Sequence, residues 1–263
     1  MPNALPTKPP RRTAEPACRS SSERSLRLLG LLAEQGRAQT LAELSLRLAL
    51  PKATTHRLCA QLLAGGYLAR DIDERSFVVG PALRALALDA LNHGTARALR
   101  HEVLAEVVAK VGETCNFTTR DGASVLYLDR VEAPWPWRLT MDVGVHVPLH
   151  CTASGKLFLA FMPEAEREAL LAHLALPRLT ANTIIRARAL RVECEAIARR
   201  GHAMDREEFV AGLVALAVPV CDAQGQVRAA IAVHAPSARL SARAALARLP
   251  ALTEAARRMG RLL

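Results

Sequence analysis

The side chains best suited to hold a polyanion stand close together near the amino end of the chain. Five of them fall within six residues: Lys52, Thr54, Thr55, His56 and Arg57. No aspartate or glutamate occurs from residue 44 to residue 70, so no carboxylate weakens the local positive potential. Basic and hydroxyl side chains in such surroundings contact the phosphates and base edges of duplex DNA.

Hydrophobic spacing predicts that these side chains begin the second helix of a helix-turn-helix. Before them, Leu41, Leu44 and Leu48 repeat at helical spacing, and the pair Thr40 and Glu43 matches a capping box. Pro51 suits the first turn of the next helix, where its missing N–H needs no partner. The glycines at residues 65–66 suit the end of that helix.

A helical wheel divides the second helix into two faces. With Leu58 and Leu62 in the core, Pro51, Thr54 and Thr55 turn toward the packed side. The other face then carries Lys52, Ala53, His56, Arg57 and Ala60. This arrangement favours a helix that enters a DNA major groove with His56 and Arg57 near base edges.

A small hairpin is predicted directly after that helix. Residues 67–70 and 77–79 are short β-prone runs, separated by a polar turn at residues 71–76. The pattern is typical of a wing, and it adds Arg70 and Arg75 to the side chains expected to contact DNA, together with Thr54 and Thr55 at phosphates. An αα-hairpin packed into another kind of domain, with its basic residues merely solvated, is the structural alternative.

Length, charge and cysteine usage limit the class of protein. With 263 residues the chain can form two domains, each with its own core. Residues 1–80 carry 12 basic and 7 acidic side chains, against 23 and 18 in residues 81–263, so positive charge is denser toward the amino end. Residues 1–21 predict a disordered leader. The six cysteines lack metal-type spacing, which favours a reducing cytoplasm and neither a metal nor another cofactor.

Beyond the wing, the pattern predicts a linker helix at residues 81–94 and an α+β domain at residues 95–263 built around an antiparallel sheet. The longest apolar run, residues 213–221, contains Pro219 and is too short to span a bilayer, so no membrane association is expected. Strands are expected at residues 115–119, 124–131, 137–143, 202–204, 213–220 and 227–234. Helices are expected at residues 82–92, 95–111, 152–161, 164–174, 187–200 and 242–262, with residues 144–150 irregular.

Small residues mark a second place where a ligand can bind. Ala153, Ser154 and Gly155 stand where a loop enters a predicted helix. The first amides of a helix have no partner within it, and they favour a carboxylate or another anion. Close packing of the helix on the sheet would need the same small side chains and is the alternative explanation.

The chain resembles the IclR family of bacterial transcription regulators over nearly its full length beyond the leader. The matching segments are LPKATTHRL (50–58), LYLDRVE (126–132), VGVHVPLHCTASGK (143–156) and DREEFVAGLVALAVPV (205–220). The resemblance implies a winged helix-turn-helix at residues 22–80, the linker helix, and a GAF-like effector-binding domain. It also implies a homodimer or a dimer of dimers.

The family's effector pocket can be carried over position by position. It implies that a small-molecule effector contacts Ala153, Ser154, Asp205, Ala215, Ala232 and His234. Family members with small keto-acid effectors have cysteine where Ala215 stands and serine where Ala232 and His234 stand. Because the two alanines widen and dry the pocket, we expect a carboxylate that is bulkier, or aromatic.

The sequence contains no recognisable enzyme motif. There is no nucleophile elbow around Ser154, no HExxH and no phosphate-binding loop, and the adjacent His150 and Cys151 are poorly placed to act as an attacking pair. We therefore expect no catalytic residues, and a sequence-specific regulator that binds a double-stranded operator under effector control. A small-molecule sensor or an enzyme without a DNA-binding role is the alternative function.

Overall fold

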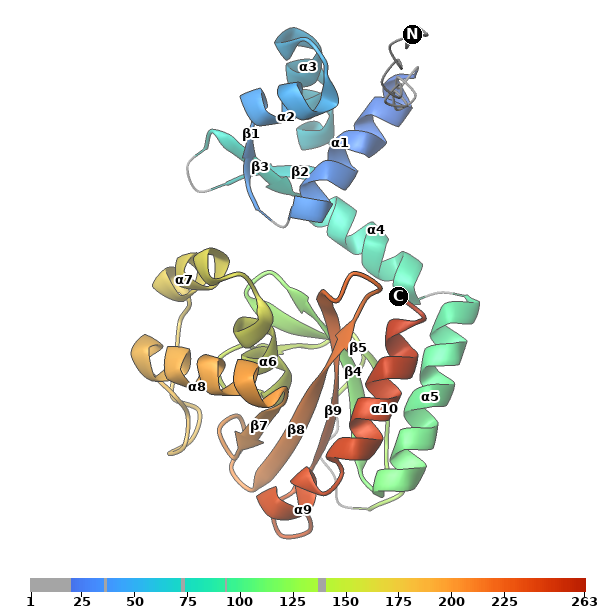
Figure 1. The fold of residues 1–263 in the computed structure, drawn as a ribbon, viewed down its shortest axis with the longest axis vertical. Helices are drawn as coiled ribbons and strands as arrows, with labels where there is room; N and C mark the ends of the chain where they lie inside the picture. Colours follow the sequence, from blue (N-terminus) through green and yellow to red (C-terminus); the bar gives the residue numbers. More distant parts are fainter. Residues whose placement is uncertain (1–19, 36, 72–73, 93, 137–140) are drawn as a thin grey trace, which may run out of the picture. The chain divides into compact units, whose positions relative to one another are not determined.

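The computed structural model describes residues 20–35, 37–71, 74–92, 94–136 and 141–263 (Figure 1). The chain divides into two compact units, residues 1–87 and residues 88–263, and each has its own hydrophobic core. The predicted leader lies almost wholly outside the described residues. No helix among the described residues has the length and apolar character needed to cross a membrane.

The first unit is a winged helix-turn-helix, as predicted. Its helices are α1 (Ser21–Gln35), α2 (Leu41–Leu48), α3 (Lys52–Ala64) and the start of α4 (Pro81–Asn92). Its antiparallel strands are β1 (Gln39–Thr40), β2 (Leu68–Arg70) and β3 (Ser76–Val79), in the order β1-β3-β2. The sequence analysis identified neither α1 nor β1. Leu28, Leu29 and Leu32 of α1 belong to the core of this unit, so the helix is part of the fold.

Local hydrogen bonds fix the turn between α2 and α3. The hydroxyl of Thr40 accepts a bond from the Glu43 amide, and the Glu43 carboxylate accepts one from the Thr40 amide, which confirms the capping box. Ala49 ends α2 in the left-handed region at a φ of 53°. The Ser45 hydroxyl then donates to the carbonyl of Leu50 at 2.6 Å, so the turn is braced from inside.

The second unit is built on a six-stranded antiparallel sheet with the strand order β6-β5-β4-β9-β8-β7. The strands are β4 (Thr114–Asp121), β5 (Ser124–Val131), β6 (His146–Pro148), β7 (Ala203–Arg206), β8 (Leu213–Cys221) and β9 (Val227–Pro236). The helices are α5 (Thr95–Val111), α6 (Ala153–Phe161), α7 (Glu164–His173), α8 (Ala187–Arg200), α9 (Ala242–Leu246) and α10 (Leu249–Gly260). The predicted α+β architecture is therefore confirmed.

Two sequence-based predictions about elements were wrong in detail, and a third was tested only in part. The strand expected at residues 137–143 falls partly on residues 137–140, outside the described residues, and residues 141–143 are not strand. Instead β6 forms within the stretch expected to be irregular. The helix expected at residues 242–262 is two helices, because Pro250 has no N–H to continue the hydrogen-bond ladder from α9.

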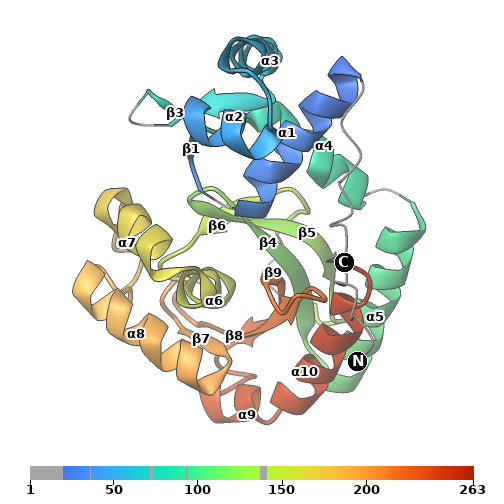
Figure 2. The ribbon, with the colours of Figure 1, turned by 45° about the horizontal axis from the view of Figure 1, so that its top comes forward.

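Strict alternation of side chains gives the sheet two different faces. On β8, Val214, Leu216 and Val218 face the core that includes α5 and α10. Ala215 and Ala217, between them, face the core that includes α6 and α8. Figures 1 and 2 show the sheet held between these two groups of helices. The small side chains on the second face allow α6 to lie close to the sheet.

Removing the capping box should weaken the first unit measurably. Thr40→Ala deletes the hydroxyl that accepts from the Glu43 amide, so we expect the free energy of unfolding to fall by about 1 kcal/mol. Chemical denaturation of the full chain, with the unfolding of the first unit followed separately, measures this free energy. Thr54→Ala is the matched control, since it removes the same atoms away from a cap; equal losses in both variants would contradict the capping role.

Candidate nucleic-acid interface and ligand cavity

The outward face of α3 is basic and free of acidic side chains. Lys52, His56 and Arg57 are exposed, with Ala53 and Ala60 beside them, whereas Leu58 and Leu62 are buried. The burial pattern divides α3 as the helical wheel predicts, except that Pro51, which was expected on the packed side, is exposed. An exposed row of basic and small residues lets a helix approach the edges of base pairs closely.

Thr55 does not belong to this face. Its side chain is fully buried, and its hydroxyl donates to the carbonyl of Pro51 at 3.2 Å. The hydroxyl is occupied in the core of the first unit, so we withdraw the expected phosphate contact of Thr55. Thr54 is half-buried and keeps partial access to solvent. Pro51 is the N-cap of α3 and not its first helical residue.

The wing presents two further arginines. The guanidinium of Arg70 lies 4.5 Å from the centre of the Phe77 ring and donates to the carbonyl of Glu74 at 3.0 Å. These contacts hold Arg70 along the hairpin while leaving it exposed. Arg75 is exposed in the turn between β2 and β3. Both arginines can therefore reach a polyanion beside α3.

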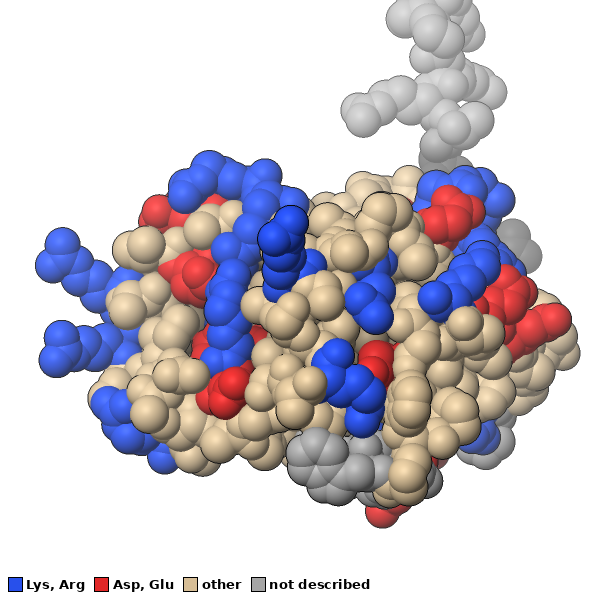
Figure 3. Space-filling model, turned by 90° about the horizontal axis from the view of Figure 1, so that it is seen from below, with Lys and Arg blue, Asp and Glu red and all other residues tan. Residues whose placement is uncertain are grey.

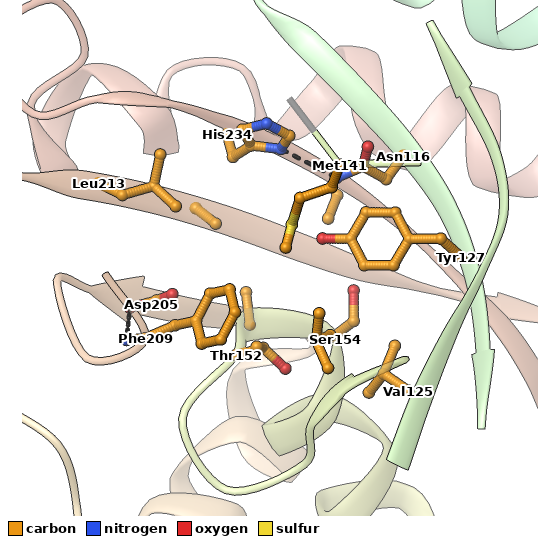
Figure 4. Close-up of a pocket in the computed structure, with 14 residues that line it drawn as sticks. Asn116, Val125, Tyr127, Met141, Thr152, Ser154, Asp205, Phe209, Leu213 and His234 are labelled. Carbon is orange, nitrogen blue, oxygen red and sulfur yellow. Dashed lines mark hydrogen bonds between the residues drawn. The ribbon is translucent and has the colours of Figure 1, made fainter. Parts of the chain in front are cut away.

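The second unit contains a cavity between the sheet and the start of α6 (Figure 4). The cavity has a volume of about 30 Å³. That is room for about two water molecules, so the cavity is narrow. All six predicted effector positions line it: Ala153, Ser154, Asp205, Ala215, Ala232 and His234.

Strand register brings these distant residues together. Asp205 on β7 pairs with Ala215 on β8, and Ala215 pairs with His234 on β9, so the three stand in one row across the sheet. Ala232 lies two residues along β9 on the same face, because side chains alternate along a strand. The first turn of α6 closes the cavity from the opposite side.

Thr152 prepares the start of α6 for an acceptor. Its hydroxyl accepts from the Gly155 amide at 3.1 Å and donates to the carbonyl of Pro148 at 2.7 Å. The amides of Ala153 and Ser154 precede the first bonded amide of the helix and border the cavity. This end of the cavity therefore favours a carboxylate or another oxygen acceptor.

Asp205 is the acid of the cavity. Its Oδ1 accepts from the amides of Glu208 at 2.7 Å and Phe209 at 3.4 Å. Burial raises the pKa of Asp205 to about 7, and the nearby carboxylate of Glu208 adds to that shift against the opposing effect of the two amides and Lys156. Near neutral pH this carboxyl can thus keep a proton and donate it to an acceptor.

Polar contacts orient the opposite rim. The Asn116 side-chain nitrogen lies 2.9 Å from Nδ1 of His234, while its oxygen accepts from Arg130 at 3.3 Å. Since arginine only donates, the amide group of Asn116 must donate to Nδ1. Tyr127 extends its phenol toward the cavity (Figure 4), and burial raises the pKa of that phenol to about 12. The hydroxyl therefore stays neutral.

Sequence reasoning missed eight lining residues. They are Asn116, Val125, Tyr127, Met141, Val147, Thr152, Phe209 and Leu213. Period-two alternation along residues 124–131 could have placed Val125 and Tyr127 on one face. Pairing of β4 with β9, which Asn116 requires, is a non-local contact with no signal in the single sequence.

Cys151 and His150 are not arranged as a catalytic pair. Burial raises the pKa of the Cys151 thiol to about 12, and it lowers the pKa of His150, whose Nε2 contacts the carbonyl of Pro177 at 3.0 Å. A neutral thiol is a poor nucleophile. Within the described part of the chain, no group of three His, Cys, Asp or Glu side chains could hold a metal ion.

On the face seen in Figure 3, the basic residues form no large patch that is free of acidic residues. There, lysine and arginine side chains alternate with aspartate and glutamate. Several arginines of the second unit are paired: Arg191 with Glu168 at 2.7 Å, Arg239 with Glu113 at 2.6 Å, and Arg258 with Glu106 at 2.5 Å. The α3 face, which has no aspartate or glutamate, differs from this pattern.

A winged helix-turn-helix joined to a unit with a buried, acceptor-favouring cavity defines a ligand-responsive transcription regulator. Comparison with known proteins agrees. The model of the bacterial transcriptional regulator IclR C-terminal domain matches residues 89–261, and that of the IclR helix-turn-helix domain matches residues 21–71. The chain belongs to the IclR family. It is a transcriptional regulator with a DNA-binding domain and an effector-binding domain.

Individual relatives cover most of the chain. The probable transcriptional regulator SauR of Cupriavidus necator is 40% identical over 222 residues, which span 84% of this chain and 88% of that protein. The regulator BhcR of Paracoccus denitrificans is 30% identical over 244 residues, 90% of this chain and 85% of its own. The crystal structure of Thermotoga maritima IclR superposes with a TM-score of 0.62 at 26% identity, covering 92% and 97% of the two chains.

Close packing at the start of α6 predicts that Gly155 tolerates no side chain. A Cβ there would lie 2.5 Å from the Cα of Leu149. Gly155→Ala should therefore lower the free energy of unfolding of the second unit by about 1–3 kcal/mol or more. Denaturation measures the effect. Gly30→Ala in α1 is the control, since it meets nothing within 4 Å and should be neutral or stabilising; an equally harmless Gly155→Ala would disprove the close contact.

The raised pKa of Asp205 predicts a pH-dependent stability. An unfolded aspartate ionises near pH 4, about three units below the folded value of about 7. Between these values the unfolded chain releases a proton that the folded chain keeps, so this residue's contribution to stability is lost as pH rises from about 4 to about 7.

Asp205→Asn should abolish that contribution. Relative to the wild type, the variant should gain on the order of 2–4 kcal/mol between about pH 5 and about pH 8 in urea denaturation. A wild-type minus variant difference that stays constant across this range would show that Asp205 ionises normally.

Proposed function

We propose that the protein is a cytoplasmic, sequence-specific DNA-binding regulator whose operator affinity is set by a small carboxylic acid bound in the second-unit cavity. The observation that carries the proposal is the convergence of Asp205, Ser154 and His234, from three separate segments, on one cavity beside a helix N-terminus. The DNA-binding part of the proposal rests on the family relationship. The chemistry of the cavity supports the class of effector.

The DNA contacts follow from the exposed basic face. Lys52, His56 and Arg57 would enter a major groove at the start of α3, with Thr54 beside the backbone. Arg70 and Arg75 would contact phosphates or the neighbouring minor groove from the wing. A symmetric dimer of such units requires a near-palindromic operator of double-stranded DNA.

The polar groups of the cavity match a carboxylate. The amides of Ala153 and Ser154, the Ser154 hydroxyl and the Tyr127 phenol are donors, and a protonated Asp205 adds another. The cavity's small volume favours a short acid. The two alanines on the sheet do not leave wide space, since Met141, Phe209 and Leu213 also line the cavity. A bulkier or aromatic acid is the second candidate, supported by the apolar lining, and would require Phe209 and Met141 to rotate.

Self-association is supported by exposed apolar side chains on α4. Ala85, Leu86, Ala87 and Ala90 are exposed there, and Leu86 has 57% of its surface accessible. A helix with so much exposed apolar surface gains by burial against another chain. We propose a homodimer or a dimer of dimers. Because α4 links the two units, an effector that binds one arrangement of the units better would shift the DNA affinity.

Arg57→Ala should weaken operator binding by about ten-fold or more and reduce its salt dependence, because one cationic contact is lost. The operator is first selected from random-sequence duplexes, and affinity is measured by fluorescence anisotropy over a range of salt. Arg199→Ala, an exposed arginine of the second unit, is the matched control and should leave both quantities unchanged. Failure of any sequence to be enriched would exclude sequence-specific binding.

A thermal-shift screen tests the effector. Short carboxylic acids, with benzoates included, should raise the melting temperature, because a ligand of the native state stabilises it. The amide of each acid serves as the uncharged control. Ala232→Leu should remove the shift by filling the cavity while the protein stays folded. A shift that persists in this variant would place the effector elsewhere.

A further inference from the structure

Lys156 is a fully buried lysine one turn into α6. It stands two residues after Ser154, on the helix whose first turn forms one wall of the effector cavity. Its ammonium bonds to the carboxylate of Glu208, which is itself 5% exposed. A charge buried to this extent needs a partner and specific surroundings.

The neighbouring charges leave Glu208 as the main counter-ion. The carboxylate of Glu193 on α8 lies 3.9 Å from the Lys156 ammonium, but it is bonded to Arg200 at 2.7 Å. Oε1 of Glu208 also accepts from the Arg206 amide at 3.3 Å. The other titratable groups close to the pair are Asp205, Cys151, His150 and Cys194.

Glu208 belongs to the turn that forms the opposite wall. The amides of Glu208 and Phe209 bind Asp205, and both Asp205 and Phe209 line the cavity. Glu207 holds the turn at a φ of 61°, outside the range most residues prefer. The hydroxyls of Thr180 and Thr183 bond to the carbonyls of Glu207 and Glu208 at 2.6 Å and 2.7 Å.

A buried ion pair adds little net stability compared with apolar side chains of similar size, because desolvation offsets the attraction. Breaking one by removing a single partner is nevertheless costly, since it leaves a buried charge uncompensated. The pair joins α6 to the turn after β7, and its two residues, Lys156 and Glu208, are 52 positions apart in the chain. Its main effect on the fold is therefore to hold these two segments in place relative to each other.

We infer that Lys156 is a positioning residue, which through Glu208 holds the Asp205–Phe209 turn at a fixed distance from the first turn of α6. This inference rests on the proposed function, since it concerns the site that would receive the effector. Without the pair, the two walls of the cavity would open independently, and the donors of α6 would no longer face Asp205.

Hydrogen exchange of the full chain tests this without any ligand. Lys156→Met keeps the length of the side chain and removes its charge. Peptides that cover residues 150–158 and 203–212 should both exchange at least about ten-fold faster, while peptides from α5 and α10 keep the wild-type rate. Glu208→Gln keeps the shape of the carboxylate and should accelerate the same two peptides. Glu208→Gln provides the test of the positioning role if Lys156→Met does not fold.

A double variant separates the ion pair from simple packing. If each single variant leaves its partner's charge buried and uncompensated, Lys156→Met combined with Glu208→Gln should accelerate exchange in the two peptides by much less than the product of the two single accelerations. Loss of packing alone would give the double variant the full product. Arg191→Met, which breaks an exposed pair with Glu168, is the matched control and should leave both walls unchanged.

Two results would overturn the inference: faster exchange in one wall only, or the same acceleration in every peptide of the second unit. The effector screen and this experiment fail separately. If the walls loosen as expected but no acid binds, the proposed effector is wrong and the positioning role stands.

Discussion

The register of the central sheet is the constraint on which the effector-binding unit depends. Side chains alternate along β8 and β9, so one face receives large apolar residues and the other receives alanines, Asp205 and His234. A shift of one residue would turn the whole set to the wrong side. The alanines allow α6 to approach, and the acid and the imidazole remain in the one place where that helix begins. Core packing and ligand chemistry are thus decided by the same pairing.

The cavity accepts energetic costs that a purely structural core would avoid. Asp205 is buried beside Glu208, and the resulting pKa of about 7 shows that its ionised form is disfavoured. Lys156 is buried as well, and its ammonium group neutralises the charge of Glu208. Strongly perturbed pKa values cluster at functional sites, which agrees with the proposed effector site. Under the proposed function the narrow volume would add selection by size, since a larger acid would have to displace Phe209 or Met141.

The sequence predicted most of what depends on local pattern. The capping box at Thr40, the two faces of α3 and the wing follow from spacing within a few residues. The structure confirms them, apart from Pro51, which is exposed and not packed. Thr55 was assigned to DNA because its residue type suited phosphate, yet its position on the wheel already pointed inward. The burial shows that periodicity was the better guide.

Contacts between segments far apart in the chain could not be predicted from the sequence. The break before α10 follows from Pro250, which the pattern contained, but β6 exists only because β5 offers it an edge. Tyr127, Asn116 and the Lys156–Glu208 pair depend on contacts between segments far apart in the chain. The six effector positions were carried over by resemblance to a family, and their convergence on one cavity depends on strand order that spacing alone does not encode.

The most direct test of the account is operator affinity measured with increasing concentrations of a carboxylic acid that stabilises the protein. The account predicts that the acid changes the affinity of the wild type, and that the same acid has no effect on Ala232→Leu even though this variant binds the operator normally. An operator affinity that ignores an acid bound in the cavity, or that responds equally in the filled variant, would contradict control of α3 from this site.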